Sequence, residues 1–108
     1  MKGLYDIVQI AITQVERKFN VNETLLLISH NKPIYWSWGV EKRINIRDGG
    51  LLIKVKGRKF KGFVNIVLAW DDLYKVHLIK NNGEVLKTLS DIYFDCLVEI
   101  IDNEIETN

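Results

Sequence analysis

The sequence predicts an α+β fold with an N-terminal helix, an antiparallel meander of five to six strands and a C-terminal helix. Both ends of the 108-residue chain carry apolar residues at the three- and four-residue spacing of an amphipathic helix. The middle holds short runs rich in β-branched and aromatic residues, separated by turn residues. The length fits a single domain, residues 1–108, and we expect both helices to pack on one sheet face.

The first predicted element is a helix that starts near residue 4 and stops near residue 20. Asp6 lies near its start, and Arg17 and Lys18 lie near its end, as the helix dipole favours. The residues of its apolar stripe are Leu4, Ile7, Val8, Ala11, Ile12, Val15 and Phe19.

Two strands are expected next, at residues 24–30 and 34–40. The first, TLLLISH, is a short apolar run bounded by polar residues, which is typical of a buried strand. Pro33 pushes Lys32 away from helical backbone angles. The second, IYWSWGV, is rich in aromatic and β-branched residues. The following residues, 41–50, are polar and end in turn residues.

Residues 51–70 predict two further strands, and the second of them is apolar on both faces, which places it centrally in the sheet. Residues 70–73 predict a turn. Asn82-Gly83 between two β-type runs predicts a hairpin with a type I′ turn. That turn would place Ile79 opposite Leu86, and Val76 opposite Leu89.

The final segment returns to helical spacing, and Ser90 or Asp91 can cap it. Its apolar stripe consists of Phe94, Leu97, Val98, Ile101 and Ile105, widened by Tyr93, Cys96 and Ile100. The acidic residues Asp95, Glu99, Asp102 and Glu106 form the predicted solvated face.

Composition narrows the class of protein. The chain is 47% hydrophobic and 27% charged with a net charge of +1, an ordinary globular balance. One cysteine, Cys96, excludes an internal disulfide and favours a reducing compartment. The N-terminal residues lack the apolar core of a signal peptide, and no run is long enough to span a membrane. We therefore expect a cytoplasmic protein without membrane contact.

Trp36 and Trp38 form the first candidate site. On a strand they would point to the same face. The favoured interpretation is that at least one ring fills the core, because aromatic residues dominate small cores. The alternative is a stacking or anchoring surface for a base or a protein partner.

A basic stretch is the second candidate. Residues 41–62 hold eight basic residues against two acidic ones, whereas residues 88–108 hold six acidic residues and no basic one. The interpretations are a solvated face that protects a sheet edge, steering toward a charged protein, or contact with nucleic acid. The partner-binding candidates are Trp36, Trp38, Lys54, Lys56, Arg58, Lys59, Phe60 and Lys61.

Catalysis has little support in the sequence. No phosphate-binding glycine loop, nucleophile elbow or metal-ligand spacing is present, so we expect no catalytic residues, no metal and no cofactor. An enzyme centred on His77 and Cys96 would need both side chains in one cleft. The aligned carboxylates of the last helix would favour a cationic partner, for which a second copy in a homodimer is one candidate.

Residues 35–102 resemble small uncharacterised proteins of bacterial phages and mobile elements. The similar pieces are the SWG segment, KGFVNIVL at residues 61–68, the following Asp72-Leu73-Tyr74, and YFDCLVEIID at residues 93–102. These motifs supply no catalytic residues. The resemblance implies a small accessory protein that binds a host protein, such as a component of a defence system.

The sequence therefore favours a non-enzymatic binding protein that acts stoichiometrically on a protein partner, in its sharpest form an inhibitor of a host defence complex. The second hypothesis is an RNA or single-stranded DNA binder that uses the basic segment 54–61, with Trp36 or Phe60 for stacking.

Overall fold

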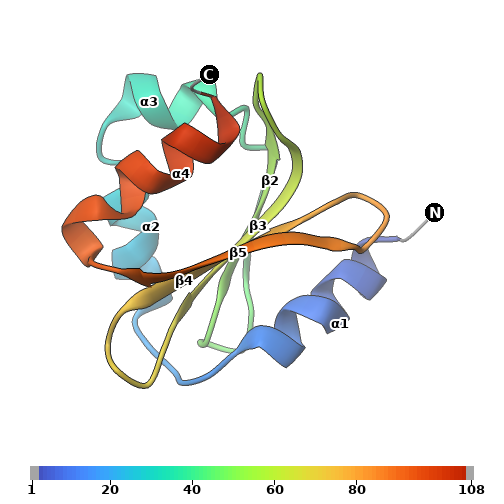
Figure 1. Ribbon diagram of the computed structural model, residues 1–108, viewed down its shortest axis with the longest axis vertical. Helices are drawn as coiled ribbons and strands as arrows, with labels where there is room; N and C mark the ends of the chain where they lie inside the picture. Colours follow the sequence, from blue (N-terminus) through green and yellow to red (C-terminus); the bar gives the residue numbers. More distant parts are fainter. Residues whose placement is uncertain (1–2, 107–108) are drawn as a thin grey trace.

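Within residues 3–106, a five-stranded antiparallel sheet separates one helix from three others (Figure 1). The computed structural model describes residues 3–106. The strands are β1 (Lys42–Asn45), β2 (Leu51–Lys56), β3 (Lys61–Leu68), β4 (Tyr74–Ile79) and β5 (Val85–Ile92). Each strand pairs with the next one in the chain, so the sheet is a meander with β3 at its centre. The predicted α+β class, meander and central strand are confirmed.

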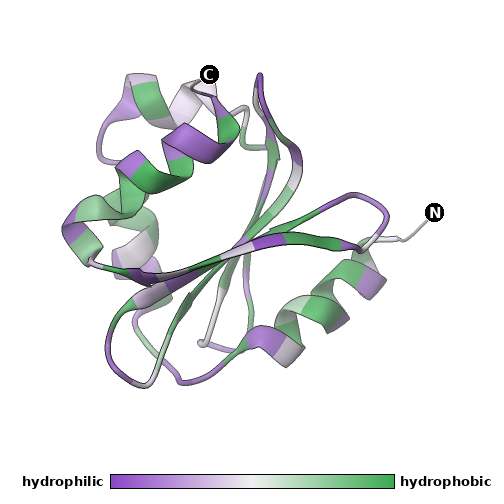
Figure 2. Ribbon diagram, viewed as in Figure 1, coloured by the Kyte–Doolittle hydropathy of each residue, from purple (hydrophilic) through white to green (hydrophobic). Residues whose placement is uncertain are grey.

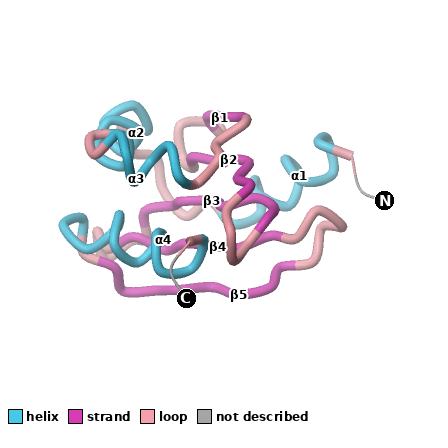
Figure 3. The backbone as a smooth tube through the Cα atoms, turned by 90° about the horizontal axis from the view of Figure 1, so that it is seen from above, coloured by secondary structure: helices cyan, strands magenta, loops and turns pink. Residues whose placement is uncertain are grey.

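Helices cover both sheet faces, so the prediction that they pack on one face is wrong. Helix α1 (Leu4–Gln14) lies on one side, and α2 (Val21–Ser29), α3 (Lys32–Ser37) and α4 (Leu97–Ile105) lie on the other (Figure 3). Two hydrophobic clusters result, because alternate residues of a strand point to opposite faces. Leu52 packs with α1, whereas Leu51 and Ile53 pack with the other helices. Each helix carries both hydrophobic and hydrophilic residues along its length (Figure 2).

Residues 24–29 belong to helix α2 and His30 is its C-cap, so the strand predicted at residues 24–30 is wrong. The Asn20 side chain accepts a hydrogen bond from the Glu23 backbone N–H at 3.1 Å and caps the helix. Thr24 and Ile28, one turn apart, are both buried. An N-cap and a helical stripe therefore outweigh the strand preference of a short apolar run. The preceding helix α1 ends earlier than predicted, at Gln14, because Val15 is extended.

The predicted strand at residues 34–40 is replaced by α3, which Asn31 caps through the Ile34 backbone N–H. Pro33 is tolerated because the first helical turn needs no donor at that position. Two residues span about 200° of a helix, so the two tryptophans point to opposite sides. Trp38 is 0% exposed and Trp36 is 71% exposed. One ring is core and the other is surface.

Two boundaries in the second half also differ from prediction. The polar segment at residues 41–50 contains the edge strand β1 before its turn. Strand β5 continues to Ile92, which pairs with Tyr74, so no helix begins at Ser90 or Asp91. A 3₁₀ turn, η1 (Phe94–Cys96), leads instead into α4.

The β4–β5 hairpin is confirmed, but its turn is not of type I′. Gly83 has φ 92°, and Asn82 is not among the residues with positive φ. A type I′ turn requires positive φ at both positions. Val76 pairs with Leu89 as predicted, whereas Ile79 pairs with Val85 and not with Leu86. A bulge absorbs the extra residue.

Candidate functional site

Four lysines from three strands gather on the α1 side of the sheet. Leu51, Ile53 and Val55 face the other helices, so Lys54 and Lys56 face α1. Strand register places Lys42 directly opposite Lys54, and Lys61 directly opposite Lys56. We call Lys42, Lys54, Lys56 and Lys61 the lysine face.

The lysine face has no acidic neighbour among residues 3–106 at ion-pair distance. Some basic residues elsewhere in that range do have acidic partners: Lys75 pairs with Glu16 at 2.6 Å, and Lys87 pairs with Glu104 at 2.9 Å. Like charges directly opposite one another destabilise a sheet. Two such pairs side by side therefore give a surface that would gain from an anion.

Helix α1 is fixed beside the lysine face by a buried amide of the central strand. Asn65 is 0% exposed, and its Nδ2 donates to the Ala11 carbonyl oxygen at 3.3 Å and to Gln14 Oε1 at 2.8 Å. Lys75 and Glu16 add an ion pair at the C-terminal end of the helix. These contacts place the first turn of α1 next to Lys42 and Lys54.

A cleft of about 270 Å³ opens where α1 meets the lysine face. Its lining residues are Gly3, Leu4, Ile7, Lys42, Lys54, Phe63 and Asn81. The Lys54 Nζ lies 5.9 Å from the centroid of the Phe63 ring, within cation–π range. A second cleft of about 370 Å³ lies on the other sheet face, lined by Lys59, Phe60, Leu78, Leu86, Lys87 and Glu104.

Two of the predicted partner-binding residues, Trp38 and Phe60, are buried, and a third, the exposed Lys59, contacts the end of α4. Trp38 is fully buried and donates from Nε1 to Asp102 Oδ1 at 2.9 Å. Phe60 is 8% exposed and packs in the core, so it offers no stacking surface. Lys59 donates from Nζ to the Asn103 carbonyl oxygen at 3.0 Å. Its backbone N–H donates to Ile105, so Lys59 helps to cap α4.

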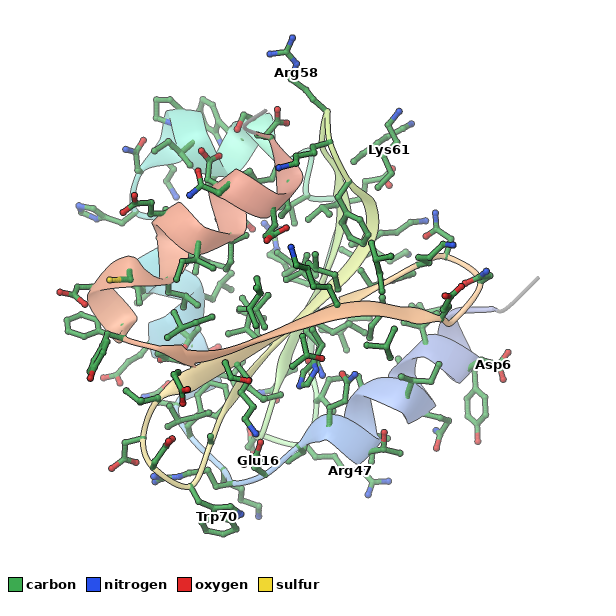
Figure 4. The ribbon with its side chains drawn as sticks, viewed as in Figure 1. Asp6, Glu16, Arg47, Arg58, Lys61 and Trp70 are labelled. Atoms are coloured by element: carbon green, nitrogen blue, oxygen red, sulfur yellow. The ribbon has the colours of Figure 1, made fainter. Side chains whose placement is uncertain are left out.

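Other basic residues of the β2–β3 hairpin do reach solvent. Arg58 and Lys61 point away from the protein at the tip of this hairpin (Figure 4). Lys56 is also exposed, and Lys54 is half-buried at the cleft. Lys42 was counted in the basic stretch but not among the partner-binding candidates, because residues 41–50 were interpreted as a polar segment that ends in a turn. The alternation of Ile44 and Ile46 with Arg43 and Asn45 was the available signal for a strand, and it places Lys42 on the same face as Ile44.

Trp70 was also missed as a surface residue. It lies in the β3–β4 turn, is 75% exposed and points outward at the end of the protein opposite Arg58 and Lys61 (Figure 4). A tryptophan directly before Asp71-Asp72, two turn-forming residues, was the signal. Trp36 and Trp70 are thus exposed aromatic residues that a partner could contact.

The four carboxylates of the predicted acidic face of α4 do not form one solvent-exposed surface. Asp95 and Glu99 are exposed, but Asp102 accepts the Trp38 hydrogen bond and Glu106 is half-buried. The neighbouring Glu104 pairs with Lys87. The prediction of one solvated acidic face is therefore wrong at Asp102, because the buried Trp38, which directly follows α3, packs against this part of α4.

His77 and Cys96 lie on opposite sides of the sheet and share no cleft. His77 follows Val76, which packs with α4, and so faces α1; its Nδ1 lies 2.8 Å from Thr88 Oγ1. Burial, and then the charge of Lys75, lower the pKa of His77. Cys96 packs on the α4 side, where loss of hydration and then Asp95 raise the pKa of its thiol. Neither shift favours a reactive thiolate–imidazolium pair.

Within residues 3–106, no three His, Cys, Asp or Glu side chains are grouped closely enough to hold a metal ion. None of the helices in that range combines the length and apolar character that crossing a membrane requires. Comparison with protein-family models, with curated proteins and with solved structures found no match for this chain.

Proposed function

We propose that this is a non-enzymatic binding protein whose lysine face binds the phosphate backbone of nucleic acid. The main support for the proposal is that Lys42 lies directly opposite Lys54, and Lys56 directly opposite Lys61, while none of the four has an acidic partner among the described residues. Phosphates between the pairs would replace repulsion by attraction and release counterions. Arg58 adds a further cation that points away from the protein at the hairpin tip (Figure 4).

Edge protection explains only one of the four lysines. Lysines on an edge strand prevent strands of other molecules from pairing with it. Lys42 is on the edge strand β1, but Lys54 and Lys56 are on β2, and Lys61 is on the central strand β3. Lysines on inner strands cannot protect a sheet edge, so these three favour a role in binding a ligand.

An acidic protein surface is the second candidate partner, favoured by the exposed rings of Trp36 and Trp70. Tryptophan is enriched among the residues that dominate binding energy at protein interfaces. Binding to an acidic protein would agree with the hypothesis of a phage or mobile-element accessory protein that inhibits a host defence complex. A nuclease-treated pull-down separates it from nucleic-acid binding.

The test measures binding of a fluorescein-labelled 12-nucleotide single strand by anisotropy between 50 and 200 mM salt. Single strands give a slope of about −0.7 in log K against log salt per neutralised phosphate. Four lysines predict a slope of about −3 and about a fiftyfold loss of affinity over that range. The double variant Lys56→Gln/Lys61→Gln should make the slope shallower by about 1.4.

Lys18→Gln is the matched control, because exposed Lys18 follows the opposite end of α1. It should leave the slope unchanged. Absence of binding at 50 mM salt would contradict the proposal. A defined protein that stays bound after nuclease treatment, and is lost in Lys56→Gln/Lys61→Gln, would favour the second candidate.

A further inference from the structure

The cleft beside the lysine face joins two kinds of surface. Its apolar lining comes mainly from Leu4 of α1, which is 40% exposed, because Ile7 of α1 and Phe63 of the central strand are almost fully buried beneath it. Its polar rim comes from Lys42 and Lys54 on one side and from Asn81, in the β4–β5 turn, on the other. A ligand that fills it needs an apolar body next to an anionic group.

The size of the cleft argues against a lone phosphate. Its volume of about 270 Å³ equals the space of roughly nine liquid waters at about 30 Å³ each. It is close to the lower limit of about 300 Å³ for small-molecule pockets. A phosphate on the two lysines would leave most of this volume filled by water.

The chemistry of the rim fits one nucleotide. Lys54 is held over the Phe63 ring, so a cation and an apolar wall are adjacent, as are the phosphate and base of a nucleotide. The carboxamide of Asn81 both donates and accepts hydrogen bonds, as the edge of a base does. Its exposed position lets it turn toward a base in the cleft.

We propose that the cleft receives one unstacked base of a single strand while Lys42 and Lys54 bind the adjoining phosphate. This inference rests on the proposed function, because the lysine face must first bind the backbone. A paired base is held in the duplex and would have to be flipped out at an energetic cost. Single strands should therefore bind more tightly than duplex, although charge density alone favours duplex.

The experiment compares a labelled 12-nucleotide single strand with the matching 12-base-pair duplex by anisotropy at 100 mM salt. Wild-type protein should bind the single strand about tenfold more tightly. Leu4→Trp fills the cleft from a residue that is 40% exposed, and the ratio should fall to near one. Leu26→Trp, on exposed α2 surface, is the control and should keep the ratio. Asn81→Ala, at an exposed turn position, should lower it about threefold.

Each remaining outcome has a defined meaning. Equal wild-type affinity for single strand and duplex, or a preference that both Leu4→Trp and Asn81→Ala retain, overturns the cleft inference and leaves backbone binding intact. Absence of binding to either nucleic acid overturns both proposals. Polyglutamate binding as tightly as the single strand, without sensitivity to Leu4→Trp, would identify a surface for acidic proteins and overturn the cleft inference.

Discussion

Removing one lysine from each opposed pair should stabilise the fold while weakening nucleic-acid binding. The variant is Lys42→Gln/Lys56→Gln, which leaves Lys54 and Lys61 without a like charge directly opposite. Glutamine keeps most of the side-chain length and removes only the charge. Substituting a residue that serves only the fold lowers the free energy of unfolding. An increase in that free energy would therefore indicate a binding role and not a structural one.

The expected gain follows from Coulomb's law. Directly opposed side chains have Cβ atoms about 5 Å apart, and their ammonium groups can splay to about 7 Å. Two unit charges about 7 Å apart in water repel by about 0.6 kcal/mol. Two pairs therefore give a gain of about 1 kcal/mol at low salt, which raises the urea midpoint by about 0.5 M.

The assay is urea unfolding followed by circular dichroism in 20 mM buffer and again in 0.5 M NaCl. The gain should shrink to below about 0.3 kcal/mol in high salt, because the Debye length falls to about 4 Å. Lys18→Gln should change the midpoint little in either buffer. A low-salt midpoint at or below that of wild type would refute the claim that the lysine pairs are strained.

Three further substitutions test the fold around the site. Trp38→Phe should cost about 1–3 kcal/mol of unfolding free energy through loss of the bond to Asp102, whereas Trp36→Phe should cost less than about 0.5 kcal/mol, both by urea unfolding. Gly57→Ala should cost about 2–3 kcal/mol in the same assay, because its Cβ would lie 2.7 Å from the Ile105 carbonyl oxygen; Gly3→Ala, with a nearest atom at 4.0 Å, is its control. The lowered pKa of His77 means that the unfolded chain binds its proton first, so stability should fall as pH drops below about 6.5; His77→Gln should flatten that part of a pH series of urea midpoints.

The strands from residue 51 onward could be predicted because their patterns persist over whole elements. Residues 61–68 are apolar on both faces and form the central strand. The two wrong strand predictions fell on short runs whose strand preference is only a weak prior. Asn20 and Asn31 favour helices at these two places, because each side chain accepts a hydrogen bond from the backbone N–H three residues later. Such caps mark a helix start even where apolar spacing is ambiguous.

The candidate site was only partly visible in the sequence. The alternation of apolar residues and lysines along residues 51–56 showed that Lys54 and Lys56 share a face. Which residues lie opposite them depends on the register between neighbouring strands. The β2–β3 connection sets Lys61 opposite Lys56, and an edge strand that looked like a loop sets Lys42 opposite Lys54. Phe60 appeared to be a surface aromatic because it lies among basic residues, yet it is buried in the core. Packing of distant segments decides such cases.

The sheet edges narrow the choice of binding surface. A protein partner that adds a strand needs a long regular edge. Strand β5 offers eight residues, but its register shifts at both ends, and Asp91 has φ 57°. Bulges of this kind twist an edge and interrupt pairing. Strand β1 offers only four residues, two of them charged.

A partner is therefore expected to bind a face of the protein and not an edge. In the part of the chain that the structure describes, helices α2, α3 and α4 cover one side of the sheet, and only α1 covers the other. The part that α1 leaves open carries the lysine face and the cleft. Charge there attracts any anionic partner, so charge alone cannot separate nucleic acid from an acidic protein. The cleft would distinguish them, because an unstacked base would fill its volume of about 270 Å³ beside two cations and a carboxylate side chain would not.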